Sequence, residues 1–381
     1  MIKKNFCKSP WASIFVETDG RVKSCCPGDF YWGDLNHNSL EEILNSATVL
    51  EIKQGIINDE PVEYCKNCRQ DEKFTGTSQR FYYDYMELPD DILNSTTALE
   101  LKNIDIRWNP LCNMACVYCR PDNSTLWQQY MKIPISSLDR TYYKDLLQLV
   151  STHTETIDSV FLLGGEPLIQ NQNIELLKTL NDNCEIQVVT NLKANLEKNL
   201  VFNELKRKQN VEWNLSFENV GERFEYVRKG GNWQQQIKNI EILKSIPAHK
   251  VTLLGVYCVH SALNLRELYE FAHSADIDIH LQQLYNPTCL NILNFSKEIR
   301  QKAIDEIDAV LNLPYFNNFM EKNQIFLNTM RQMLIDKSDE QPTVHKEFCN
   351  WIDQFESMAK PHKTFDELWP ELNQLIRQSL I

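Results

Sequence analysis

Residues from about 98 to 290 alternate between strand-like and helix-like segments, and this alternation restricts the fold more than any other feature of the sequence. Short runs rich in valine, isoleucine and leucine predict six strands, at residues 101–108, 159–164, 185–190, 211–217, 250–259 and 277–284. Amphipathic stretches between them, such as "WQQQIKNIEILKS", predict helices. Strands that alternate with helices form parallel sheets of right-handed βαβ units. Six units are too few for a closed eight-stranded barrel, so we expect a partial (β/α)6 barrel.

Unusual stretches follow four of these predicted strands. The first is "CNMACVYC" (112–119), which begins four residues after the first strand. The second, third and fourth strands end in "GGEP" (164–167), "TN" (190–191) and "SFEN" (216–219). Parallel α/β folds bind ligands at the carboxyl ends of their strands. The sequence therefore predicts that all four stretches lie on one rim.

Three cysteines in eight residues predict a metal site with one position left open. Thiolates select zinc, copper(I) or iron–sulfur clusters, and structural zinc takes four protein ligands. A CxxxCxxC loop without a fourth cysteine nearby fits a 4Fe–4S cluster with one open iron, which can bind a small molecule through nitrogen and oxygen. S-adenosylmethionine (SAM) is the obvious candidate because it carries radical chemistry. A zinc half-site remains the alternative for these cysteines alone.

The loop and the rim motifs together resemble the radical SAM superfamily. The resemblance assigns Cys112, Cys116 and Cys119 to the SAM-binding cluster, and Tyr118 to the adenine. "GGEP" is similar to the motif that hydrogen-bonds the amino group of the methionine moiety, and it comprises Gly164, Gly165, Glu166 and Pro167. Glycines let the backbone approach a ligand closely, although "GGEP" alone is also compatible with an ordinary turn.

Three further residues fall where that family contacts its cofactor. They are Asn191, Ser216 and, within "SFENVGERFEYVRKG", Arg228, which would grip the cofactor carboxylate with a charge-assisted fork. Asn191 and Ser216 are also compatible with turn or cap residues, and Arg228 with a surface ion pair. This chain has Glu218 and Asn219 where the family has Asp and Gly, so the resemblance does not support a ribose role for Glu218.

The amino-terminal segment 1–88 contains a second group of cysteines. Its motifs "CKSPW", "DGRVKSCC", "SLEEILNS" and "CKNC" resemble the auxiliary-cluster module called SPASM, or its shorter version called twitch, which here precedes the barrel. The resemblance implies one auxiliary 4Fe–4S cluster on Cys7, Cys25, Cys65 and Cys68, with Cys26 as the alternative to Cys25. A zinc knot made from the same residues is the competing interpretation.

Two of the remaining cysteines occur late in the predicted barrel. Cys258 lies at the end of the fifth strand and Cys289 just after the sixth. Isolated cysteines are most often small core residues. A thiol on the rim could instead return a hydrogen atom to a substrate radical, which would predict an epimerase.

Charge and hydropathy restrict the partners and the compartment. The net charge is −13 and no basic run is longer than "KRK" (206–208), so nucleic acid is a poor candidate partner. No apolar run has the ~20 residues of a membrane span, and "MIKKNFCKSPW" lacks a signal-peptide pattern. We therefore expect a cytoplasmic protein with reduced thiols. Residues 98–290 would form the barrel, and residues 291–381 a helical extension that includes "SKEIRQKAIDEIDAVL".

The resemblance implies an oxidoreductase or maturase that cleaves SAM reductively to a 5′-deoxyadenosyl radical, which takes hydrogen from a substrate carbon. An electron donor such as flavodoxin or ferredoxin is then required. The auxiliary cluster could accept an electron from the substrate radical or act as a structural staple. A peptide or protein side chain is the leading substrate, and a sugar or other small molecule the alternative; "RFYYDYMEL" (80–88) could line a groove or be a packed linker. A zinc-stabilised interaction protein is the non-enzyme hypothesis.

Overall fold

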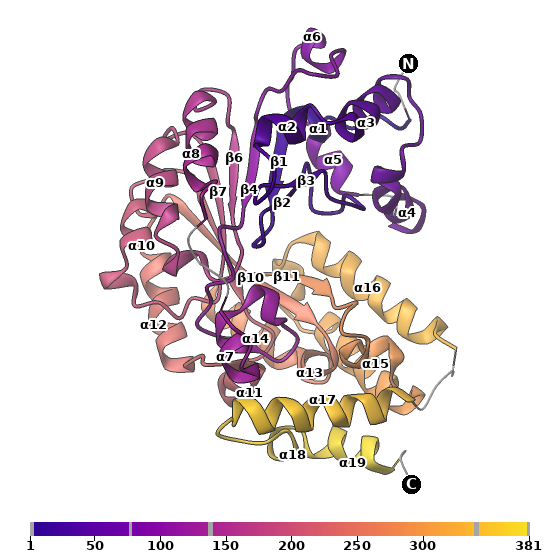
Figure 1. Cartoon of the computed structure of the whole chain (residues 1–381). Coiled ribbons are helices and arrows are strands. Elements are labelled where there is room, and N and C mark those ends of the chain that lie inside the picture. The colour runs from indigo at the N-terminus through magenta and orange to yellow at the C-terminus, as the bar shows by residue number, and fades with distance from the viewer. Residues whose placement is uncertain (1–3, 76–77, 136–139, 339–342, 379–381) are drawn as a thin grey trace. The chain divides into compact units, whose positions relative to one another are not determined.

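The computed structural model describes residues 4–75, 78–135, 140–338 and 343–378. The chain divides into two compact units. The first unit comprises Met1–Leu111, Ser136–Val188 and Lys198–Val211. The second comprises Cys112–Ile135, Val189–Glu197 and Glu212–Ile381. Figure 1 colours the ribbon by residue number, so that both units can be followed along the chain.

The first unit is built on strands in the spatial order β7-β6-β4-β1-β2-β3. Three of them were predicted: β4 (Asn103–Ile106), β6 (Ser159–Leu162) and β7 (Glu185–Thr190), which run parallel. The other three strands were not predicted. β1 (Ser13–Val16) pairs in parallel with β4, β2 (Arg21–Lys23) pairs antiparallel with β1, and β3 (Gly33–Asp34) pairs antiparallel with β2. The cysteine-rich segment therefore extends the barrel sheet, through strands of only two to four residues that carry little periodicity.

Helices lie along one face of this sheet. Figure 1 shows α8 (Tyr143–Thr152), α9 (Gln172–Thr179) and α10 (Leu200–Leu205) beside β6 and β7. Alternate strand residues share one face, and one such set is almost fully buried: Ile104, Ile106, Val160, Leu162, Ile186 and Val188. On the opposite face, Phe161 packs edge-to-face on Tyr82 of α5 (Gln79–Asp84), with ring centroids 6.2 Å apart.

The amino-terminal segment holds more helix than its sequence pattern predicts. Its other helices are α1 (Ser9–Ala12), α2 (Leu40–Leu44), α3 (Ala47–Ile57) and α4 (Lys66–Thr75), and α6 (Asp90–Leu93) follows directly after it. Ser39 is the N-cap of α2: its hydroxyl accepts from the Glu42 amide at 3.2 Å, and the Glu42 carboxylate accepts from the Ser39 amide at 2.8 Å. The stretch after Ser39 forms two helices and not one, because Ser46 caps α3 separately.

The second unit contains the other three predicted strands, β8 (Val211–Ser216), β10 (His249–Tyr257) and β11 (Asp278–Gln283), in the order β8-β10-β11. One face carries α11 (Gly221–Val227), α12 (Trp233–Lys244) and α14 (Leu265–Ala275). Phe217, just after β8, packs on Trp233 of α12 and Phe271 of α14. A short antiparallel ladder joins β5 (Ala115–Cys116) to β9 (Arg228–Lys229). All six predicted strands are thus confirmed.

The chain after residue 290 is helical, as predicted. Its helices are α15 (Lys297–Leu311), α16 (Glu321–Asp336), α17 (Thr343–Ala359), α18 (Phe365–Leu368) and α19 (Pro370–Gln378). Two further helices, α7 (Thr125–Met131) and α13 (Val259–Ala262), and seven 3-10 turns complete the described part: Glu63–Cys65, Pro121–Asn123, Pro167–Ile169, Leu196–Lys198, Thr288–Leu290, Ile292–Asn294 and Phe316–Asn318. Among these helices, none has the length and apolarity that crossing a membrane requires.

A buried histidine lies where these carboxy-terminal helices pack against α11 and α13 within the second unit. His260 of α13 is fully buried, and neither of its ring nitrogens has a hydrogen-bond partner. Its ring is surrounded by four aromatic rings, whose centroids lie 5.3–6.2 Å away: Tyr226, Phe348, Phe365 and Trp369. Burial lowers the pKa of His260 to about 3, because no neighbour stabilises the imidazolium.

This histidine should make the protein less stable as the pH falls. Below pH 6.5 the unfolded chain binds a proton on His260 that the folded chain excludes, so the free energy of unfolding decreases from about pH 6.5 to about pH 3. We expect its contribution at pH 5 to be a loss of about 2 kcal/mol. Urea unfolding of His260→Leu at pH 5 and 7.5 should lack this loss, whereas replacing the exposed His37 should leave it intact. An equal pH dependence in His260→Leu would contradict this expectation.

Candidate active site

The loop that carries Cys112, Cys116 and Cys119 is held by backbone pairing at its centre. Cys116 lies opposite Arg228 in the β5–β9 ladder, and the Cys119 amide donates to the Cys116 carbonyl at 3.0 Å. The Cys112 amide donates to the Thr125 hydroxyl of α7 at 3.2 Å. Cys116 is 8% exposed, and the other two cysteines are half-buried. The structure thus brings the three predicted ligands together on one ordered loop.

Two indole groups fix the carbonyls in the middle of this loop. Trp127 Nε1 of α7 donates to the Cys116 carbonyl at 3.0 Å, and Trp351 Nε1 of α17 donates to the Val117 carbonyl at 2.9 Å. Trp127 also packs on Phe355, one turn further along α17, with ring centroids 5.8 Å apart. The carboxy-terminal extension therefore contacts the cysteine loop directly, which the sequence did not indicate.

Removing the Trp351 donor should loosen the loop without removing a cysteine. Trp351→Phe keeps an aromatic ring but leaves the Val117 carbonyl without its donor, a loss of about 1 kcal/mol. We expect iron to leave the SAM-binding cluster about fivefold faster in the presence of a chelator, as followed by visible absorbance. Trp233→Phe is the matched control, because Trp233 packs on Phe217 and Phe224 and is not the donor to either loop carbonyl. Equal rates of iron loss in Trp351→Phe and the unmutated protein would show that α17 does not support the loop.

As thiolates the three cysteines would repel one another, and a bound cation would offset this repulsion. Burial raises the pKa of Cys116, although the Arg228 guanidinium lowers it. Burial raises the pKa of Cys119 strongly, and the neighbouring Cys116 and Cys112 raise it further, because adjacent thiolates repel. A bound metal removes this penalty, since it deprotonates coordinating thiols outright.

A buried ion pair lies directly beside the cysteine loop. Glu218 is 1% exposed, and its carboxylate accepts from Arg228 Nε at 2.7 Å and from the Tyr118 hydroxyl at 2.7 Å. Arg228 Nη1 also donates to Cys116 Sγ at 3.6 Å. Burial would lower the pKa of Arg228, but the Glu218 carboxylate, Tyr118 and Cys116 hold it well above its usual value. Arg228 is thus paired within the chain, and its contact with a cofactor carboxylate stays a prediction.

Asn191 and Ser216 lie at the ends of β7 and β8, as predicted. Asn191 Nδ2 donates to Asn113 Oδ1 at 2.9 Å and lies 3.7 Å from Cys112 Sγ, so its amide supports the first cysteine. Ser216 is 9% exposed at the last position of β8. Their contacts with SAM remain predictions.

Sequence reasoning did not assign a role to Asn219, whose buried side-chain amide has no hydrogen-bond partner. Its side chain is 2% exposed, and both its amide oxygen and its amide nitrogen lack a hydrogen-bond partner. Such groups are costly unless something pairs with them. A ligand with vicinal hydroxyls or other paired polar groups fits this amide, which supports SAM as the occupant. The only sequence clue was its position directly after Glu218, where the family pattern is broken.

The "GGEP" turn belongs to the first unit and packs against the residues that lead into the cysteine loop. Gly164 has a φ of +95°, and a Cβ atom on Gly165 would lie only 2.2 Å from the Leu111 carbonyl oxygen. The Glu166 amide donates to that carbonyl at 2.7 Å. The turn therefore needs glycine at both positions. Pro167 begins the 3-10 turn that follows, and Glu166 is 1% exposed.

The predicted auxiliary ligands converge on one cavity in the first unit. Cys7, Cys25, Cys65 and Cys68 all line it, together with Tyr64, Arg80 and Tyr83. Burial raises the pKa of Cys65 to about 12, and Cys25 and Cys68 raise it in addition. Four thiols with this mutual repulsion form a donor set that a cationic cluster would stabilise. The donor set fits the predicted auxiliary cluster.

Cys26 lies outside this cavity, although it is adjacent to Cys25. It is the exposed cysteine of the chain, whereas Cys25 is buried with its sulfur 3.7 Å from the Tyr64 hydroxyl. The structure thus groups Cys25, and not Cys26, with the other three thiols.

The two candidate hydrogen donors are both buried. Cys258 is fully buried at the N-cap of α13, 3.9 Å from the Ser261 hydroxyl, and Cys289 is 6% exposed in a 3-10 turn. Burial raises the pKa of both thiols to about 11. Both therefore occupy positions typical of core cysteines, and their hydrogen-donor role stays a prediction.

The cysteine groups differ from the geometry of a single-ion site. No group of three or more His, Cys, Asp or Glu side chains, within the ranges that the structure describes, has the geometry to hold one metal ion. A four-iron cluster binds each thiolate to a different iron, so its cysteines lie farther apart than the ligands of one ion. The wider grouping around the auxiliary cavity is compatible with such a cluster.

Comparison with known proteins identifies the class. The family described as "Radical SAM superfamily" matches residues 106–274, and the one described as "Iron-sulfur cluster-binding domain" (SPASM) matches residues 7–69. The chain belongs to the radical SAM superfamily and is an enzyme with an amino-terminal SPASM-type cluster domain. These two domains imply SAM and 4Fe–4S clusters as cofactors.

Curated relatives share only part of this sequence. A "GTP 3',8-cyclase" of Petrotoga mobilis is 25% identical over 174 residues, which cover 45% of this chain and 51% of that protein. A "GTP 3',8-cyclase" of Clostridium botulinum is 29% identical over 155 residues, covering 38% and 46% respectively. The chain thus spans about half the length of the curated relatives it matches.

Two solved structures match part of this chain. Streptococcus suis SuiB bound to S-adenosylmethionine has a TM-score of 0.41 and 16% identity, over 70% of this chain and 64% of that one. The protein anSMEcpe with bound AdoMet has a TM-score of 0.42 and 16% identity, over 60% and 62%. These are likenesses of fold.

Proposed function

We propose that this protein reductively cleaves SAM at the Cys112/Cys116/Cys119 loop and directs the resulting radical to hydrogen abstraction from a substrate carbon. The main support is a group of features in the second unit. Three cysteines lie on one hydrogen-bonded loop, and the Glu218–Arg228 ion pair lies beside Cys116. The amide of Asn219, the residue after Glu218, is buried without a hydrogen-bond partner. When bound, the cluster and SAM supply a 5′-deoxyadenosyl radical. The chain's own residues orient the cofactor and exclude water.

The contacts of these residues indicate a separate role for each. Tyr118 is fixed by its hydrogen bond to Glu218, so its ring has a defined orientation for stacking on a base. Asn219 offers one donor and one acceptor to paired hydroxyls. Asn191 supports Cys112 and Asn113 through its side-chain amide. These assignments extend the family pattern to residues of this chain.

For the substrate, we propose a peptide or protein side chain. The segment "RFYYDYMEL" supports this choice, because Tyr85 is 88% exposed and Phe81 39% exposed, while Tyr82 of the same helix anchors it through Ser159 at 3.1 Å. Exposed aromatic side chains on a fixed helix suit contact with a polypeptide. The segment is thus both a packed element and an aromatic surface.

A small-molecule substrate is the second candidate. The curated relatives are named GTP 3',8-cyclase, so the part of the chain that they share is compatible with a nucleotide or another small polar substrate. Incubation with GTP and, separately, with candidate peptides would distinguish the two, with mass spectrometry of both products. A changed GTP mass with unchanged peptides would overturn the peptide proposal.

The reaction class is tested without a known substrate. The protein is reconstituted with iron and sulfide under anaerobic conditions, and SAM and dithionite are added. We expect brown protein with about eight irons per chain and formation of 5′-deoxyadenosine. The same chain loaded with zinc is the matched control and should form none. Failure of the iron-loaded protein to bind clusters would favour the zinc-stabilised interaction protein instead.

A further inference from the structure

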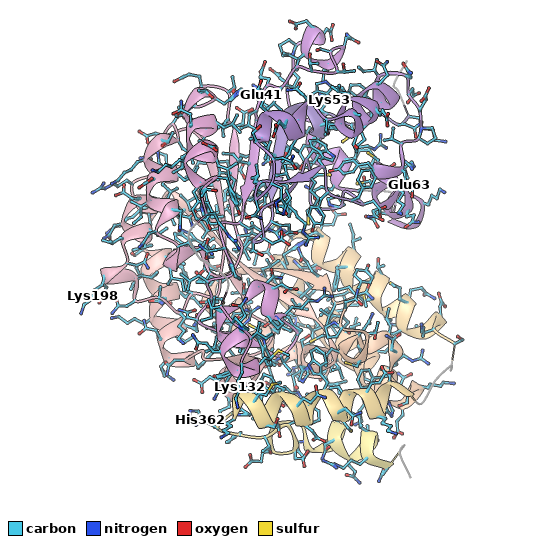
Figure 2. All side chains as sticks on the ribbon, viewed as in Figure 1. Glu41, Lys53, Glu63, Lys132, Lys198 and His362 are labelled. Carbon is cyan, nitrogen blue, oxygen red and sulfur yellow. The ribbon has the colours of Figure 1, made fainter. Side chains whose placement is uncertain are left out.

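Tyr64 contacts one of the four thiols that line the auxiliary cavity. Its hydroxyl oxygen lies 3.7 Å from Cys25 Sγ, and its side chain is 1% exposed. Tyr64 directly precedes Cys65, another of the predicted ligands, in the turn that leads into α4. Figure 2 labels Glu63, the exposed residue before Tyr64, beside this helix. The Tyr64 phenol is thus a buried polar group in the wall of the cavity.

The contacts of Ser24 determine where the Tyr64 hydroxyl hydrogen points. The Ser24 amide donates to the Tyr64 oxygen at 3.0 Å, and the Ser24 hydroxyl lies 3.1 Å from the same oxygen. A phenol has a single hydrogen to donate. A Cys25 thiolate can only accept, and a charged acceptor forms the stronger hydrogen bond. The phenol hydrogen therefore goes to Cys25 Sγ, and the Ser24 hydroxyl donates to Tyr64.

Packing holds the Tyr64 ring in this orientation. A Cβ atom on Gly28 would collide with the Tyr64 hydroxyl, so glycine is what lets the backbone approach the phenol this closely. The ring centroids of Phe30 and Trp32 lie 5.4 and 5.6 Å from that of Tyr64. Because the folded chain already fixes the donor, its hydrogen bond to a thiolate requires little further ordering of the side chain.

We propose that Tyr64 is a positioning residue that raises the reduction potential of the auxiliary cluster through its hydrogen bond to Cys25. Hydrogen bonds to the sulfurs are among the factors that set the potential of an iron–sulfur cluster. Reduction adds a negative charge, so a donor aimed at a thiolate stabilises the reduced state more than the oxidised state. Such a donor favours a cluster that accepts an electron over a purely structural staple. This inference rests on the auxiliary cluster and not on SAM cleavage, so the two can fail separately.

The test removes one hydroxyl and measures the midpoint potential. Tyr64→Phe is made in the full chain with Cys116→Ala, which should carry the auxiliary cluster alone, and is titrated anaerobically with electron paramagnetic resonance as the readout. We expect the ratio of reduced to oxidised cluster at a fixed potential to fall about tenfold, which corresponds to a midpoint lower by about 59 mV. Tyr83→Phe is the matched control, because Tyr83 lines the same cavity and is 4% exposed, but its hydroxyl pairs with Ser13. Its midpoint should stay close to that of the parent.

A second measurement detects the hydrogen itself. After exchange into D2O, electron–nuclear double resonance of the reduced cluster should show a coupling to an exchangeable deuteron that Tyr64→Phe lacks and Tyr83→Phe keeps. A change in packing alone would not remove this coupling. Ser24→Ala keeps the phenol but removes a donor to its oxygen, so it should lower the midpoint in the same direction by a smaller amount.

Each alternative result has a distinct meaning. An unchanged midpoint in Tyr64→Phe, or equal decreases in Tyr64→Phe and Tyr83→Phe, would overturn the proposal. If Tyr64→Phe bound no auxiliary cluster, Ser24→Ala would decide: a lower midpoint would support the proposal, and an unchanged one would overturn it. If the cavity bound no cluster even with Tyr64 present, the proposal would fail. Formation of 5′-deoxyadenosine by the chain with Cys116 intact would still test the proposed function separately.

Discussion

A Cys116→Ala variant should lose the SAM-binding cluster and all formation of 5′-deoxyadenosine, yet keep the auxiliary cluster. Cys116 is the central ligand of its loop and is buried beside Arg228, so no other thiol can replace it. Iron content should fall from about eight to about four per chain. The measurements are iron quantification, electron paramagnetic resonance of the reduced protein, and chromatography of the nucleoside product. Any residual SAM cleavage above the zinc-loaded control would contradict the assignment.

The adjacent pair Cys25 and Cys26 provides the matched control for the second cluster. Cys25→Ala should lose the auxiliary cluster and retain about four irons on the Cys116 loop. Cys26→Ala should keep both clusters, because its thiol lies outside the cavity that the other four cysteines line. If Cys25→Ala lost both clusters, the two sites would not be independent. If Cys26→Ala lost the auxiliary cluster, the ligand assignment would have to be exchanged.

The barrel was predictable because its strands carry strong local patterns. Segments such as "EIQVVT" alternate with amphipathic helices, and β7 has the predicted bounds of 185–190. The three cysteines and "GGEP" were predictable because the function of each motif requires particular residue types at fixed spacing. Glycine, for example, is required at position 165, where a Cβ atom would meet the Leu111 carbonyl. In both cases the requirement is local in sequence.

The remaining features depend on contacts that are distant in sequence. The pairing of β1 with β4 joins residues 90 positions apart, and β1 has only four residues, all buried, without alternation. Trp351 reaches the Val117 carbonyl across 234 positions. Arg228 was assigned to the cofactor from its motif, but a motif does not show that Glu218 pairs with the same guanidinium. Such pairings arise from tertiary packing, which local patterns do not encode.

Glu218→Ala should have the largest effect on stability of any single change at the candidate site. It would leave the Arg228 guanidinium, itself 6% exposed, as an uncompensated buried charge. It would also remove the acceptor of the Tyr118 hydroxyl. Breaking one partner of a buried ion pair costs about 3–5 kcal/mol. We expect that decrease in the free energy of unfolding, measured by urea denaturation of the metal-free protein under reducing conditions.

A double-mutant cycle separates the ion pair from a general packing defect. Glu218→Gln should cost less than Glu218→Ala, because the amide keeps the shape and can still accept from Tyr118. Glu218→Gln/Arg228→Gln should recover stability relative to Arg228→Gln alone, since each single variant leaves one buried charge and the double variant leaves none. Strictly additive losses would show that the two groups do not stabilise each other. Recovery of stability without recovery of SAM binding would show that Arg228 also contacts the cofactor.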